Sequence, residues 1–172
     1  GVAQVTRLIE SAGIELVRFV WCDTHGVTRG KALTAGAVSR AFEHGVGIVS
    51  TLMLKDTSDR TAFKVFEPGG TAGVPGFEGA NNLVLMADPA RFRQLPWTAH
   101  TGWIAGQLYF QDGRPVEIDA RRVLQKALAR LADAGFGMRC GLEVEFHVYR
   151  IESNDVRLDP EQAAWPGLPP AL

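Results

Sequence analysis

A turn sequence between two short strand-like runs is the feature that most limits how this chain can fold. The tetrapeptide Asp-Thr-His-Gly at residues 23–26 separates a run from Leu16 to Cys22 from a run between Val27 and Leu33. Aspartate and glycine are frequent turn residues, and both flanking runs have the length of a strand. We therefore expect an antiparallel hairpin. Because an isolated hairpin is marginally stable in water, more strands must lie beside it.

The remaining periodic segments supply those strands and a few helices. Apolar residues recur at helical spacing over residues 2–12 and 35–44, and again over residues 120–135 behind the capping residue Asp119. Strand-like apolar runs lie at 47–54, 83–88 and 102–110. The first hundred or so residues thus predict a small α+β domain, with a mixed sheet and one or two helices.

A second unit is expected after this domain. The helix over 120–135 should bury a stripe that includes Val123, Leu124 and Leu128, and a strand should follow over 141–150. One helix and one strand cannot cover both of their own faces, so this unit is expected to be incomplete. We place the first domain at 1–105 and the second at 106–172, with the division between residues 95 and 115.

The expected strand over 141–150 carries two acidic side chains on one face. Residues two apart in a strand have Cα atoms about 6.5–7 Å apart, so Glu143 and Glu145 are too far apart to grip one ion as a pair. They could instead hold two neighbouring hard cations such as Mg²⁺ or Mn²⁺, which often meet nucleotide phosphates. The alternative is an acidic, solvent-facing side of an edge strand, and the spacing alone favours that alternative.

A polar, glycine-rich passage over residues 55–82 is the longest stretch without a periodic pattern. Loops of this length inside compact domains are usually functional or mobile, although a plainly solvated loop is the alternative here. Its first residues include Asp56 and Asp59. In the hairpin, Arg29 and Lys31 are expected to form ion pairs or to line a subunit contact.

The bulk properties exclude several classes of function. The 172 residues have a formal net charge of -1, which gives no electrostatic basis for binding nucleic acid or an anionic membrane. No apolar run approaches the roughly 20 residues that a membrane-spanning helix needs. Cys22 and Cys140 lack the spacing of a zinc site or a disulfide framework. We expect a soluble, cytoplasmic protein.

Four segments, in this order, resemble the glutamine synthetase family. They are "WCDTHGVTRGKAL" at 21–33, "ADPARFRQLPW" at 87–97, "DARRVLQKALARLADAGF" at 119–136 and "GLEVEFHVYR" at 141–150. The last resembles the family's G-x-E-x-E-F strand and is the most specific of the four. The resemblance extends over nearly the whole chain.

The resemblance implies a fold, an activity and an assembly. A β-grasp-like N-terminal domain would precede the truncated first αβ part of a glutamine-synthetase-type catalytic domain. Family members use ATP and Mg²⁺ or Mn²⁺ to join glutamate to ammonia, or to an organic amine in the γ-glutamyl-amine or polyamine branch, through a γ-glutamyl phosphate. Their subunits form rings in which each active site lies between two neighbours. This chain would lack most of the catalytic domain and be inactive alone.

The resemblance also implies roles for three residues. Glu143 and Glu145 would each hold a different divalent ion. Asp56 would reach into the neighbouring subunit's site, bind ammonium and take its proton. The family's usual D-G-S-S is replaced here by "KDTSDR" at 55–60, so Asp59 is a second candidate and an organic amine an alternative to ammonia. A non-catalytic β-grasp interaction or assembly module derived from the family is the alternative function.

Overall fold

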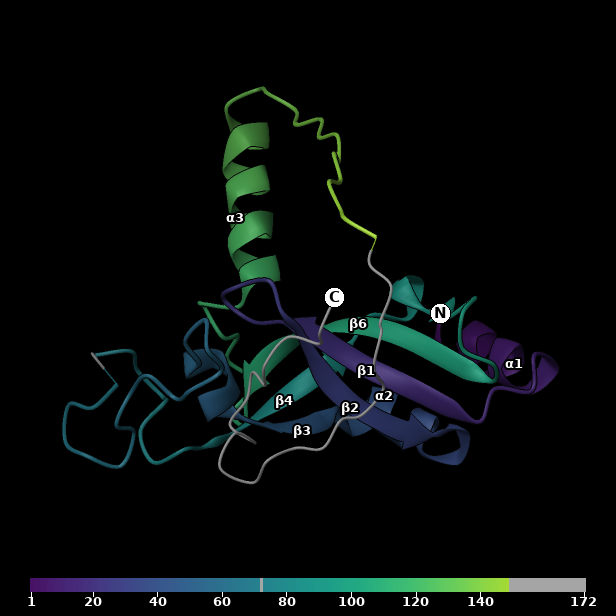
Figure 1. Cartoon of the computed structure of the whole chain (residues 1–172), viewed down its shortest axis with the longest axis horizontal. Coiled ribbons are helices and arrows are strands. Elements are labelled where there is room, and N and C mark those ends of the chain that lie inside the picture. Colours follow the sequence, from purple (N-terminus) through teal and green to yellow (C-terminus); the bar gives the residue numbers. More distant parts are fainter. Residues whose placement is uncertain (72, 149–172) are drawn as a thin grey trace.

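A six-stranded mixed sheet forms the centre of the molecule (Figure 1). The computed structural model describes residues 1–71 and 73–148. Five strands lie in the order β2-β1-β6-β4-β3, and β5 pairs with β6 beside them. β1 and β6 run parallel, and every other pairing is antiparallel. The strands are β1 Leu16–Cys22, β2 Thr28–Thr34, β3 Val46–Val49, β4 Asn82–Ala87, β5 Arg93–Gln94 and β6 Thr101–Phe110.

Two helices pack against this sheet, and their residues share its core. α1 (Val2–Ser11) buries Val5 and Ile9, and α2 (Val38–His44) buries Val38 and Ala41. The Phe42 ring of α2 meets the Phe19 ring of β1 edge to face, with centroids 6.1 Å apart. Short 3-10 turns cover Ala35–Ala37, Ser50–Leu54 and Pro89–Arg91. The predicted hairpin, both N-terminal helices and the α+β class with a mixed sheet are confirmed.

The strand expected over 47–54 is correct only in its first half. β3 ends at Val49, and residues Ser50–Leu54 form a 3-10 turn. Both stretches have buried apolar side chains, because the turn places Met53 and Leu54 in the same core. A short apolar run does not reveal which of these two conformations it adopts.

β6 passes through the position at which the sequence suggested a domain boundary. The whole strand, from Thr101 to Phe110, is hydrogen-bonded within the sheet, so a division between residues 105 and 106 would cut it. Val116, beyond the strand, is fully buried in the same core. Farther on, Asp119 Oδ2 accepts a hydrogen bond of 2.8 Å from the backbone N–H of Leu108 in β6. We therefore propose that the sheet-bearing unit extends to Asp119.

α3 (Ala120–Asp133) begins at the predicted cap and projects away from the sheet (Figure 1). Asp119 Oδ1 accepts from the backbone N–H groups of Arg121 and Arg122, as expected for a helix N-cap. The expectation that α3 buries its apolar stripe is wrong for the described residues, because Leu124 remains 51% exposed, with Val123 and Leu128 exposed too. Amphipathic spacing indicates which face can be buried, but a neighbouring surface must cover it.

Residues 141–148 form no strand, contrary to the sequence-based expectation. Leu142 is 91% exposed and Phe146 76% exposed, so the apolar side of this segment has no cover among the described residues. A strand requires a neighbouring strand for its backbone hydrogen bonds, and alternation of side chains does not supply one. Tyr149, Arg150 and the rest of the unit expected to end at residue 172 lie outside the described residues. No helix in the described part of the chain has the length and apolar character needed to cross a membrane.

Candidate functional site

A buried aspartate, Asp23, lies at the turn between β1 and β2 and holds that turn together through hydrogen bonds. The Asp23 side chain is 1% exposed. Its Oδ1 accepts hydrogen bonds of 2.9 Å from the backbone N–H groups of His25 and Val27, and its Oδ2 accepts one of 2.7 Å from Arg29 Nε. Burial alone would raise the Asp23 pKa, but the bonds from Arg29 and the two amides outweigh it and hold the pKa below its usual value.

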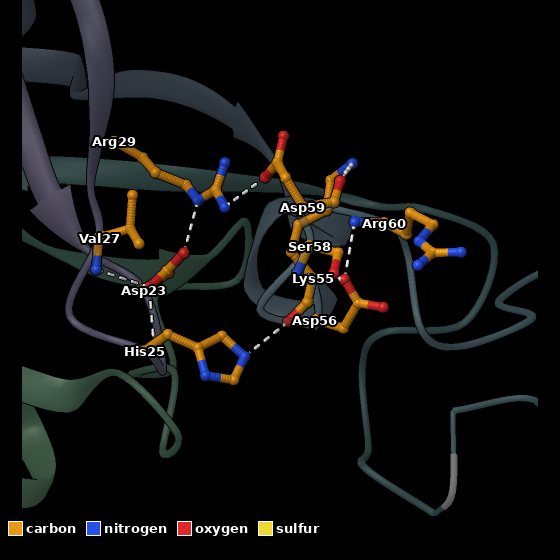
Figure 2. Close-up of polar contacts among 9 residues, drawn as sticks. All are labelled: Asp23, His25, Val27, Arg29, Lys55, Asp56, Ser58, Asp59 and Arg60. Atoms are coloured by element: carbon orange, nitrogen blue, oxygen red, sulfur yellow. Dashed lines mark hydrogen bonds and ion pairs between the residues drawn. The ribbon is translucent and has the colours of Figure 1, made fainter. Parts of the chain in front are cut away.

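Arg29 links this turn to the loop that follows β3. Its Nε binds Asp23, while its Nη2 donates a hydrogen bond of 2.6 Å to Asp59 Oδ1 (Figure 2). The guanidinium group presents several donors in one plane, so it can hold two carboxylates at once. The prediction of ion pairs is confirmed for Arg29. Lys31 forms no ion pair within residues 1–71 and 73–148.

Asp56 closes a tight turn at the start of the long loop. Its Oδ1 accepts hydrogen bonds of 2.9 Å from the backbone N–H groups of Ser58 and Arg60. The Arg60 amide is the largest cause of a lowered Asp56 pKa, and together with the Ser58 amide and the charges of Arg60 and His25 it outweighs the opposing effect of desolvation. The carboxyl group is therefore ionised at neutral pH. Its Oδ2 accepts no hydrogen bond from any described residue, which leaves this oxygen available to a cation.

The two candidate aspartates differ in their contacts. Asp59 is engaged by Arg29 and has a left-handed backbone conformation, with φ of 61°. Asp56 has no ion pair within the described part of the chain. The geometry therefore favours Asp56 over Asp59 as the carboxylate that would meet a substrate.

A pocket of about 520 Å³ separates the hairpin from this loop. His25 spans one side of it, because its Nε2 donates a hydrogen bond of 2.9 Å to the carbonyl oxygen of Lys55. The pocket is lined by His25, Val27, Arg29, Asp56, Thr57 and Asp59. Sequence reasoning missed Asp23 and His25 as parts of this site. The available signal was the turn sequence itself, since an aspartate that opens a turn often binds the following amides.

Glu143 and Glu145 lie elsewhere and do not join this cluster. Both are exposed residues of the segment after α3, which Figure 1 shows on the far side of α3 from the loop that carries Asp56. Among the described residues, no three His, Cys, Asp or Glu side chains group together as metal ligands. Two carboxylates have the right donor chemistry for Mg²⁺ or Mn²⁺ but are too few to fix either ion. The assignment of Glu143 and Glu145 to a metal stays a prediction.

We predict that this chain binds Mn²⁺ weakly, with a dissociation constant on the order of millimolar or worse, because two carboxylates leave most of the coordination to water. Isothermal titration calorimetry would measure the affinity, and Glu143→Ala with Glu145→Ala should abolish what binding there is. Micromolar affinity that survives both substitutions would contradict the assignment.

Curated proteins match the chain over almost its whole length. It is 33% identical over 170 residues to the gamma-glutamylanilide synthase of an Acinetobacter species, an alignment that covers 97% of this chain and 34% of that protein. It is 29% identical to the glutamine synthetase of Methanosarcina mazei, over 87% of this chain and 30% of the relative. The chain belongs to the glutamine synthetase family. It corresponds to the N-terminal third of these family members. A scan against models of protein families finds no match.

Solved structures agree with this membership. The structure of GmaS without ligand superposes with a TM-score of 0.56 at 26% identity, and covers 75% of this chain and 26% of its own. A complex of GmaS with ADP gives the same TM-score and identity over 76% of this chain and 26% of its own. The gamma-glutamylethanolamide synthetase of Streptomyces coelicolor is 30% identical in sequence, over 87% of this chain and 31% of that protein. The α+β fold with its mixed sheet therefore aligns with the N-terminal part of glutamine-synthetase-like proteins.

Proposed function

We propose that this chain is the N-terminal part of an ATP-dependent ligase that joins glutamate to an amine through a γ-glutamyl phosphate. The observation that carries the proposal is the 33% identity to a gamma-glutamylanilide synthase across 97% of the chain. In this proposal residues before Asp119 form the β-grasp-like domain, and α3 with the following segment begins the catalytic domain. The complete enzyme is a cytoplasmic ring of identical subunits that uses ATP with Mg²⁺ or Mn²⁺.

Asp56 is the catalytic residue of this proposal within the described chain. Its ionised carboxylate attracts the ammonium form of the substrate and accepts one proton from it, which leaves the nitrogen a lone pair for attack on the acyl carbon. As the C–N bond forms, the bond from the acyl carbon to the phosphate oxygen breaks, and the nitrogen loses its second proton to the leaving phosphate or to water. The lowered pKa makes Asp56 a better holder of a cation than a strong base. Glu143 and Glu145 are proposed as two of several metal ligands, the others lying outside the described residues.

An organic amine suits the site better than ammonia does. The pocket beside Asp56 has a volume of about 520 Å³, well beyond what an ammonium ion fills. Val27 and Thr57 supply uncharged lining next to the carboxylate. Two relatives carry names that specify an anilide and an ethanolamide product. The "KDTSDR" sequence at 55–60 also departs from the pattern of the glutamine-forming members.

The test is amine-dependent turnover by the complete ligase that carries this chain. Purified enzyme would receive glutamate, ATP and Mg²⁺ with ammonia, ethanolamine or aniline in turn. ADP release and the mass of the γ-glutamyl product would be measured. We expect an organic amine to give the highest kcat/KM, and Asp56→Asn to lower it by roughly 10²–10⁴-fold. The 172-residue chain alone should hydrolyse no ATP. No amine-dependent ADP release from the complete protein would favour the non-catalytic assembly module instead.

A further inference from the structure

We infer that Arg29 is a positioning residue, which holds the Asp56 carboxylate in place by clamping its loop to the β1–β2 hairpin. The inference rests on the proposed role of Asp56 as the amine-binding carboxylate. According to this inference, amine binding also depends on Arg29, which lies outside that loop. The connection runs from Asp23 to Arg29, from Arg29 to Asp59, and from Asp59 to Asp56 (Figure 2).

The turn that contains Asp56 and Asp59 is closed by its own hydrogen bonds and therefore moves as one body. The backbone N–H of Asp56 donates to the carbonyl of Arg60 at 2.8 Å, and the N–H of Asp59 donates to the carbonyl of Asp56 at 3.0 Å. The Asp56 carboxylate also accepts hydrogen bonds from the backbone N–H groups of Ser58 and Arg60. Whatever fixes Asp59 in space thus fixes Asp56.

The far end of the connection is anchored in the core. Asp23 is buried, and its second oxygen holds Arg29 Nε at 2.7 Å, so the guanidinium group has little freedom to shift. From that fixed point Arg29 reaches Asp59, which is 30 residues away in sequence. A hydrogen bond of 2.9 Å from Lys55 Nζ to the Asp59 carbonyl braces the same residue from within the loop. The bond between His25 and Lys55 is a second link across the pocket.

Only an arginine can make this connection. Its planar fork binds two carboxylates through different nitrogens, whereas a lysine ammonium is a point charge on a flexible stem. A lysine at position 29 would stay with the buried Asp23, because an uncompensated buried carboxylate is the costlier outcome. Arg29→Lys should therefore release Asp59 while it keeps the hairpin paired.

Two substitutions weaken the contact between Arg29 and Asp59 without leaving the buried Asp23 unpaired. Arg29→Lys keeps a cation beside Asp23, and Asp59→Asn weakens the contact with Arg29 by removing the charge of the half-buried Asp59. Asparagine tolerates the left-handed φ of 61° at position 59, so the turn itself is preserved. The matched control is Asp112→Asn, which weakens a comparable but exposed pair in which Arg114 Nε lies 2.7 Å from Asp112 Oδ2.

The structural arm uses the 172-residue chain and backbone 15N relaxation measured by NMR. The Ser58 and Arg60 amides should keep their hydrogen bonds to the Asp56 carboxylate, but a turn released from the hairpin moves more freely, so their order parameters should fall in Arg29→Lys and Asp59→Asn. Order parameters of Leu85 and Ile104 in the core strands should keep their wild-type values, which separates a local release from general destabilisation. Asp112→Asn should change none of the four, and unchanged order parameters at Ser58 and Arg60 in Arg29→Lys and Asp59→Asn would contradict the inference.

The kinetic arm uses the complete ligase. Arg29→Lys and Asp59→Asn should each raise KM for the amine by about tenfold and leave KM for ATP unchanged, because a displaced carboxylate weakens amine binding alone. The double variant should be no worse than either single one, since both substitutions break one connection. Additive effects would mean that Asp59 acts on the amine directly, and would overturn the inference.

The remaining outcomes separate this inference from the proposed function. If Asp56→Asn weakens amine binding while Asp59→Asn and Arg29→Lys do not, Arg29 does not position Asp56, and the proposed function stands. If Asp56→Asn leaves amine kinetics at the wild-type values, the role of Asp56 is wrong, and the inference built on it fails too.

Discussion

Replacing Asp23 by alanine is expected to destabilise the folded chain by about 3–5 kcal/mol, the usual cost of removing one partner of a buried ion pair. The substitution removes the acceptor of Arg29 and of the His25 and Val27 amides in one step. Most domains are stable by only about 5–15 kcal/mol, so a large part of the population should unfold on mild heating. Urea unfolding followed by circular dichroism would measure the loss.

The pH dependence of the same variant gives an independent check. The pKa of Asp23 is lowered in the folded chain, so its ionised form stabilises the fold at neutral pH. This contribution begins to fall near the unfolded pKa of about 3.9 and is lost as the pH drops through the folded pKa. The stability gap between wild type and Asp23→Ala should therefore narrow in acid. An equal gap at pH 7 and pH 3, or a loss no larger than that of the exposed control Asp112→Ala, would contradict the role assigned to Asp23.

Mixing two inactive variants of the complete ligase is expected to restore about a quarter of the wild-type activity. One variant carries Asp56→Ala and the other Glu145→Ala. In the proposed ring, Asp56 serves the neighbouring subunit, while Glu143 and Glu145 serve their own. After dissociation and random reassembly in equal amounts, roughly one contact in four unites an intact Asp56 with an intact pair of glutamates. Amine-dependent ADP release would be compared with wild type treated in the same way.

Each variant dissociated and reassembled on its own is the control for this experiment and should stay inactive. Mass spectrometry of the intact assemblies would establish that mixed rings have formed. Verified mixed rings as inactive as their parents would show that Asp56 and Glu145 do not serve a shared site. The same experiment with Asp59→Ala in place of Asp56→Ala tests whether Asp59 is the aspartate that serves the neighbouring subunit.

Local sequence predicted those parts of the fold that depend on neighbouring residues. The turn at 23–26 and the cap at Asp119 were correct, because each is decided by a few side chains bonding to adjacent backbone. The stripe of α3 and the strand over 141–150 were not confirmed, because both depend on a surface that covers them. Alternating side chains favour a strand only when another strand is available to pair with it.

The same distinction between local and distant contacts applies to the candidate site. Asp56 was predicted from its position near the family's aspartate, although the sequence "KDTSDR" departs from the family pattern, and that assignment stays a prediction. The turn that Asp56 closes is local. The connection from Asp23 through Arg29 to Asp59 could not be predicted, because Arg29 and Asp59 are 30 residues apart along the chain. A single sequence gives no register between a hairpin and a distant loop. The preference for Asp56 over Asp59 likewise required knowing which of them Arg29 binds.

The position of β6 governs how the protein must fold during its synthesis. β6 lies between β1 and β4, so the β1–β2 hairpin and the β3–β4 pair have no contact through the sheet until the ribosome has released Phe110. Until then β1 and β4 each present an open edge of unpaired backbone groups, which neighbouring nascent chains could join. Pairing Leu16 with Thr101 also closes a long loop, a slow step in folding. Shielding of these edges during synthesis would then affect the yield of folded protein in the cell, in addition to the final stability of the sheet.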